Sequence, residues 1–98
     1  MYRLSWVSPT HGIALHCLDV PFLFDVLGAR RVDAIAGDNP PRVLADAMHG
    51  AAVGFLHDSR PGWAPTAEGR RGATRIFDVG RSAPDVVSDG YASVAALI

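Results

Sequence analysis

The sequence predicts an α/β fold from three observations. Residues Tyr2 to Val7 alternate and are rich in aromatic and β-type residues, which favours a strand. Apolar residues recur at helical spacing after Pro40-Pro41, and Ala73 to Val79 again favours a strand. The chain has 98 residues, 49% of them apolar, which suits one small domain that can bury a core.

The loop after the first strand carries His16. Asp19 can then cap a short helix, and Pro21 can occupy its first turn. We expect this helix to extend to Leu27, with Gly28 as its natural stop. The predicted order is therefore a strand, a histidine loop and a helix.

The strongest helix prediction begins at Pro40-Pro41, where Asp38 or Asn39 can cap the helix. Before it, residues 29 to 39 form a connection whose form the sequence does not define, except that Gly37 to Asn39 ends any regular element. We expect the core face of the helix to consist of Leu44, Met48, Ala51 or Ala52, and Phe55.

Gly50 and Gly54 lie on this predicted helix, where each glycine costs roughly 1 kcal/mol relative to alanine. Their i, i+4 spacing therefore predicts a close approach by another element.

Beyond the helix, Trp63 is expected to pack back onto the body. A weak strand at Val86-Val87 is expected to form a hairpin with the preceding strand, and Tyr91 to Ile98 can start a helix.

Charge and hydropathy exclude several classes of partner. Nine arginines and no lysine oppose nine aspartates and one glutamate, so the formal net charge is −1 and no basic block is present to bind nucleic acid. No basic start precedes a long apolar run, and no segment approaches the ~20 apolar residues of a membrane span. We expect a cytoplasmic chain with neither nucleic-acid nor membrane partners.

His16 is the leading candidate for catalysis, because histidine is the side chain best suited to transfer protons near neutral pH. A lone histidine in an apolar setting is more often a hydrogen-bonded structural residue. The sequence around it favours the catalytic interpretation.

Several stretches carry a resemblance to a known family, in this order: Tyr2 to Trp6, Ala14 to Phe24, Leu44 to Met48, Phe55, and Pro61 to Trp63. In the type B carboxylesterases, a family of α/β-hydrolases, a strand Y-x-F-x-W precedes a loop L-G-A-x-H-x-x-D/E-L-P-F-x-F. A helix L-A-x-x-M-x-x-x-W-x-x-F and the segment T-G-x-P-x-W follow. The chain resembles the C-terminal part of this family over most of its length.

The resemblance implies that residues 1–98 form a single partial domain of an α/β-hydrolase, which taken alone is expected to look like a small α+β domain. It also implies that His16 corresponds to the catalytic histidine of a Ser-His-acid triad. The sequence departs from the family at Ile13, where the family loop has glycine. A β-branched residue resists the φ values that glycine permits, so the resemblance does not define the backbone path of this loop.

A serine hydrolase also needs a nucleophile, an acid and oxyanion donors, and α/β-hydrolases present serine, acid and histidine in that order. No G-x-S-x-G motif occurs here: the segment around Ser82 lacks the final glycine. Asp19 lies close to His16, but the family's acid lies well upstream, so capping is the expected role of Asp19. The resemblance thus implies that an upstream esterase chain supplies the serine and the acid.

Cys17 and the other histidines offer weaker alternatives. Cys17 adjoins His16, but neighbouring side chains usually point apart, whereas a nucleophile meets its base across the fold. His49 and His57 are eight residues apart, too far for the i, i+4 pair of zinc-binding helices, and the spacing of His11 and His16 matches no strong metal pattern. We expect no metal and no cofactor.

Two functional hypotheses follow. In the first, the chain is a carboxylic ester hydrolase fragment that is inactive alone, and Phe22 and Phe24 help to exclude water from a small ester bound near His16. In the second, it is a non-catalytic remnant that acts as a small self-associating or partner-binding domain. The second hypothesis depends on the missing triad members and on an open sheet edge, which is a route to pairing with another chain.

Overall fold

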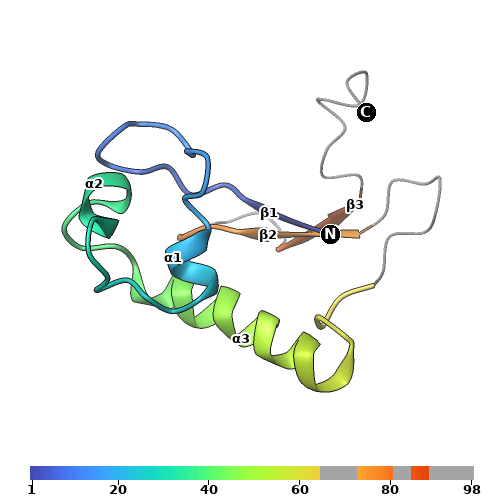
Figure 1. The fold of residues 1–98 in the computed structure, drawn as a ribbon. Helices are drawn as coiled ribbons and strands as arrows, with labels where there is room; N and C mark the ends of the chain where they lie inside the picture. The colour runs from blue at the N-terminus through green and yellow to red at the C-terminus, as the bar shows by residue number, and fades with distance from the viewer. Residues whose placement is uncertain (65–72, 81–84, 89–98) are drawn as a thin grey trace.

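The structure, a computed structural model, describes residues 1–64, 73–80 and 85–88 (Figure 1). In this part the chain forms a small mixed α/β fold with three helices and a three-stranded mixed sheet, in agreement with the predicted class. The elements in chain order are β1 (Tyr2–Leu4), α1 (Val20–Leu23), α2 (Val32–Ala36), α3 (Arg42–Asp58), β2 (Ala73–Phe77) and β3 (Val86–Ser88).

The strands lie in the order β1-β2-β3. β1 and β2 are parallel, with Tyr2 opposite Arg75 and Leu4 opposite Phe77. Parallel neighbouring strands need a long crossover connection. In this chain the connection from β1 to β2 contains the three helices. α3 runs along one face of the sheet (Figure 1). Within the described residues, β1 pairs with β2 alone, so no described strand lies along its other edge.

The core lies between the sheet and the helices. Leu44 and Met48 are buried on one face of α3, as the helical spacing predicts, and Ala45 is buried beside them. Phe22 of α1 packs edge-on against Trp6, with ring centres 5.3 Å apart. The buried cluster consists of Leu18, Phe22, Val32, Ala36, Leu44, Ala45, Met48 and Phe77.

Phe55 departs from the predicted core face of α3. Its side chain is 51% exposed, whereas Leu44 and Met48 are buried. The cause is that the C-terminal half of α3 borders a cavity instead of a packed surface. The predicted close approach at Gly50 and Gly54 is also absent from the described structure, because a Cβ at either position would have no neighbour within 4 Å.

The first helix is shorter than predicted. α1 does not reach Leu27, because Asp25 adopts a left-handed conformation with φ +55° and the chain turns before Gly28. Asp19 occupies the N-cap position and Pro21 lies in the first turn, as expected. The Asp19 side chain makes no capping hydrogen bond, so the capping prediction is wrong.

The start of α3 also differs from the prediction. Its N-cap is Pro41, which has no side-chain cap, so neither Asp38 nor Asn39 performs that role. Residues 29–39, the connection whose form the sequence did not define, contain α2. This helix follows Arg31, which has a φ of +71°, and ends at Gly37, with a φ of +82°. Gly37 thus ends a regular element, as predicted.

The strands and Trp63 follow the predictions more closely. β1 ends at Leu4 rather than Val7, although the Ser5 N–H still donates to the Phe77 carbonyl at 2.9 Å. β2 and β3 are antiparallel, which confirms their predicted pairing. Trp63 donates its indole N–H to the Met1 carbonyl at 2.8 Å and so packs on the body. The predictions for residues 81–84 and 91–98 lie outside the described residues.

Candidate functional site

His16 lies on the turn between β1 and α1, with its side chain exposed to solvent. Its neighbours hold the backbone of this turn in place. Leu18 is fully buried in the core, and Leu15 is partly buried against it. The turn therefore combines an anchored backbone with an imidazole ring that is accessible to another molecule.

A hydrogen bond between Tyr2 and Asp19 fixes the end of the turn. The Tyr2 hydroxyl donates to the Asp19 carboxylate at 2.8 Å, which joins β1 to the start of α1. This bond explains the failed capping prediction. Asp19 has helical dihedral angles (φ −70°, ψ −26°), whereas a capping residue normally adopts extended ones, and its carboxylate reaches the strand instead.

The backbone on both sides of His16 uses left-handed conformations. In the histidine loop, positive φ values occur at Gly12 (φ +72°) and at Cys17 (φ +63°). Ile13 has no positive φ, so the residue that departs from the family pattern is accommodated by a turn at the preceding glycine. Gly12 donates its N–H to the Ser8 carbonyl at 2.7 Å, which closes that turn.

Helix α2 supports the far side of the loop. The buried Ser8 hydroxyl donates to the Ile35 carbonyl, and His11 Nε2 lies 3.1 Å from the Ala34 carbonyl oxygen. Gly37 packs so closely on Pro9 that a Cβ would lie 2.8 Å from the proline ring. Sequence reasoning missed these supports. The only sequence feature that pointed to these contacts was the break of the strand at Ser8 and Pro9.

The remaining histidines have separate positions. His49 Nδ1 lies 2.9 Å from the Leu23 carbonyl oxygen, so it joins α3 to the end of α1 when that nitrogen carries the proton. His57 is exposed in the last turn of α3. In residues 1–64, 73–80 and 85–88, no three histidine, cysteine or acidic side chains lie close enough to hold a metal ion.

The described residues do not assemble a triad around His16. No hydrogen bond to the His16 ring occurs within them, and Asp19 is engaged with Tyr2. Cys17 is exposed, and Ser82, the weak nucleophile candidate, lies outside the described part of the chain. Within the described residues, the site is therefore an exposed imidazole on an anchored turn, without an acid or a nucleophile beside it.

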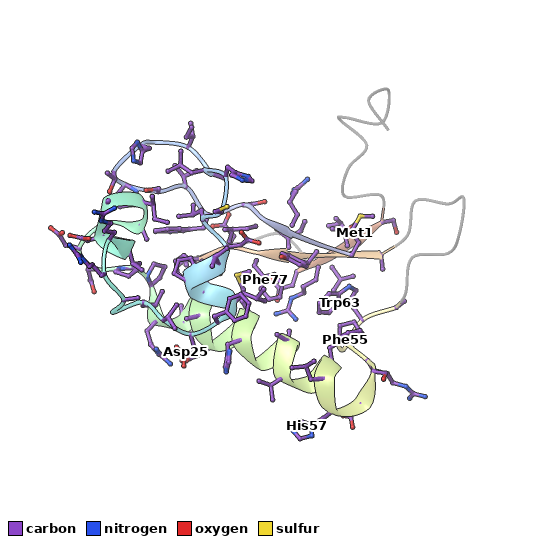
Figure 2. All side chains as sticks on the ribbon, in the orientation of Figure 1. Met1, Asp25, Phe55, His57, Trp63 and Phe77 are labelled. Carbon is purple, nitrogen blue, oxygen red and sulfur yellow. The ribbon has the colours of Figure 1, made fainter. Side chains whose placement is uncertain are left out.

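An apolar cavity of about 270 Å³ lies apart from His16, which is not among its lining residues. It is bounded by the sheet, the C-terminal half of α3 and the segment around Trp63 (Figure 2). The cavity could not be predicted from the sequence, because its walls come from several separate segments between Met1 and Phe77. We regard His16 as the candidate for proton transfer and the cavity as a separate feature.

Among the residues that the structure describes, α3 is the longest helix at 17 residues, and no helix has the length and apolar character needed to cross a membrane. No protein-family model matches the chain.

Proposed function

We propose that this chain is the histidine-bearing, C-terminal part of a carboxylesterase-like α/β-hydrolase, and that His16 is its general base. The observation that supports the proposal is the position of His16. Its ring is exposed on a turn between a strand and a helix, while buried Leu18 and the Tyr2–Asp19 hydrogen bond hold that turn. A base that serves a nucleophile on other polypeptide needs this combination of access and fixed position.

The proposed chemistry is ester hydrolysis through an acyl-enzyme. In acylation His16 Nε2 takes the proton of a serine hydroxyl and passes it to the leaving alcohol, and in deacylation it takes a proton from water. An acid that accepts a hydrogen bond from Nδ1 orients the ring. The serine, the acid and the oxyanion donors come from polypeptide outside the described residues.

Burial bears on which aromatic side chain could contact the ester. Phe22 is fully buried against Trp6 and belongs to the core, so the proposal assigns it no direct contact with the substrate. Phe24 is 63% exposed and is available for that role. The open edge of β1 offers a place where strands of a larger sheet can add, since unpaired strand edges bind further strands.

The test is reconstitution with the polypeptide encoded immediately upstream. The two chains together should hydrolyse a short-chain aryl ester such as p-nitrophenyl butyrate. His16→Ala should reduce kcat by roughly 10⁴-fold or more, because the members of a triad act as a unit. His57→Ala, which removes an exposed imidazole on α3, is the matched control and should leave kcat unchanged. Undiminished turnover in His16→Ala would exclude the proposed role.

A second candidate function is non-catalytic self-association. It is favoured by the one-sided pairing of β1 within the described residues and by exposed apolar side chains, among them Leu56, which is 81% exposed. Unpaired edges and apolar surface both promote association between chains. This candidate predicts an oligomer without any partner polypeptide.

A further inference from the structure

The apolar cavity lies between the sheet and the C-terminal half of α3. Figure 2 shows Phe55, Trp63 and Phe77 around this space. Tyr2, Leu23 and Met48 also line it, and its volume is about 270 Å³. Cavities lined by apolar side chains hold small apolar ligands, and an enclosed space of ~150 Å³ is enough for benzene. By proportion, this cavity has room for a ligand of roughly ten non-hydrogen atoms.

A cation lies against two of the side chains that line the cavity, although it is not itself a lining residue. Arg75 is on the same face of β2 as Phe77, two residues along the strand. Its guanidinium carbon is 4.7 Å from the centre of the Phe77 ring and 6.0 Å from that of Trp63, and both rings line the cavity. The positive charge therefore lies against two aromatic walls of the space.

Arg75 has no anionic partner within the described residues. The ion pairs found there belong to Arg42, and Arg75 Nε is buried without a hydrogen-bond acceptor. A buried N–H of a charged group that lacks an acceptor is unfavourable. An anion bound beside the two rings would satisfy it, and a carboxylate matches the planar fork of guanidinium donors.

We propose that the cavity binds a small apolar monocarboxylate, whose alkyl or phenyl body fills the space and whose carboxylate pairs with Arg75. Octanoate and 3-phenylpropionate have the appropriate size and charge. The proposal does not depend on ester hydrolysis, because His16 does not line the cavity.

The experiment is calorimetric titration of the full 98-residue chain with 3-phenylpropionate and, separately, with 3-phenylpropionamide. The two ligands have the same shape but differ in charge. The acid should bind roughly 10- to 100-fold more tightly than the amide, as expected for charge-assisted hydrogen bonds. Arg75→Met, which keeps an apolar stem and removes the guanidinium, should abolish that preference. Arg30→Met, the same change at an exposed position, should preserve it.

A second variant tests the cavity without changing the charge of Arg75. Ala52 lines the space, so Ala52→Leu should weaken binding of the acid and the amide alike. Equal affinity of the wild-type chain for acid and amide overturns the proposal, even if Arg75→Met fails to fold. If the chain binds neither ligand and forms an oligomer that Arg75→Met dissociates, the partner of Arg75 is a carboxylate of a second copy, and the proposal is also overturned.

Discussion

Cys17 is held in a conformation that costs free energy. Its φ of +63° lies in the left-handed region, where the Cβ of an L-residue approaches the following carbonyl oxygen, at a cost of roughly 1–2 kcal/mol. The thiol is exposed and has no hydrogen-bond partner within the described residues, while the Cys17 carbonyl accepts from the Val20 N–H at 3.2 Å. The strain lies one residue after His16, in the turn that presents the imidazole ring.

Replacement of Cys17 by glycine should therefore stabilise the protein. Cys17→Gly should raise the free energy of unfolding by about 0.5–1 kcal/mol, since glycine adopts positive φ without the Cβ contact but has more entropy in the unfolded chain. Cys17→Ala removes the thiol and retains the Cβ, so its stability should stay within about 0.5 kcal/mol of the wild type. Urea denaturation of the three proteins measures both effects. A glycine variant no more stable than the alanine variant contradicts the explanation.

At the scale of elements, Arg42 joins the turn after α1 to the first turn of α3. Its Nη1 lies 2.6 Å from Asp25 Oδ1, and its Nε donates to Asp46 Oδ1 at 3.1 Å, one turn along the same helix. The Arg42 guanidinium beside Asp25 holds the pKa of that carboxyl below its ordinary value, and the same contact raises the pKa of Arg42. The two helices are thus connected by a contact that depends on pH.

The sign of this dependence follows from the lowered pKa of Asp25. The contribution to stability is complete above the unfolded-state pKa, about 3.9, and is lost as the pH falls through the lower folded-state pKa. The difference in stability between the wild type and Asp25→Asn should therefore be constant above about pH 5 and decline below about pH 4. Urea midpoints at pH 7, 5, 3 and 2 measure it. Asp38→Asn, at an exposed position, serves as the control. A pH-independent difference contradicts the assignment.

Elements with a periodic buried face could be predicted from the sequence, because burial leaves a repeat in the residues themselves. This was true of β2 and of most of α3, whereas β1, whose three residues are all partly exposed, was predicted from its aromatic and β-type residues. The short helices could not be predicted, since tertiary contacts decide their ends: Asp25 turns the chain after α1, and the Ser8 hydroxyl binds the Ile35 carbonyl in α2. One-turn helices contain too few residues for a periodic signal.

The candidate site likewise has features that could be predicted from the sequence and features that could not. His16 could be selected from residue chemistry and from the resemblance around it. The Tyr2–Asp19 bond could not, because it joins residues 17 positions apart in different elements and gives Asp19 a role other than capping. The cavity beside Arg75 depends on the parallel pairing of β1 and β2, which no local pattern in the sequence specifies.

At the scale of the whole molecule, the parallel pairing of β1 with β2 places the N-terminal strand at an edge of the described sheet. The N–H of Ser5 and the carbonyl of Met1 bond to β2, so the alternate N–H of Leu4 faces the opposite side. A further strand would add along that side. The larger-sheet and self-association hypotheses both require this edge.

Self-association through this edge is tested with two exposed valines. Val7 lies three residues after the end of β1 and is 53% exposed, whereas Val43 lies at the start of α3 and is 64% exposed. Charged side chains at a strand edge oppose pairing. Val7→Lys should therefore raise the dissociation constant of the oligomer by roughly tenfold, equivalent to about 1.4 kcal/mol, while Val43→Lys should leave it unchanged. Light scattering after size-exclusion chromatography, over a hundredfold range of protein concentration, provides the measurement. A wild-type chain that stays monomeric throughout, or an equal response of both variants, excludes association through β1.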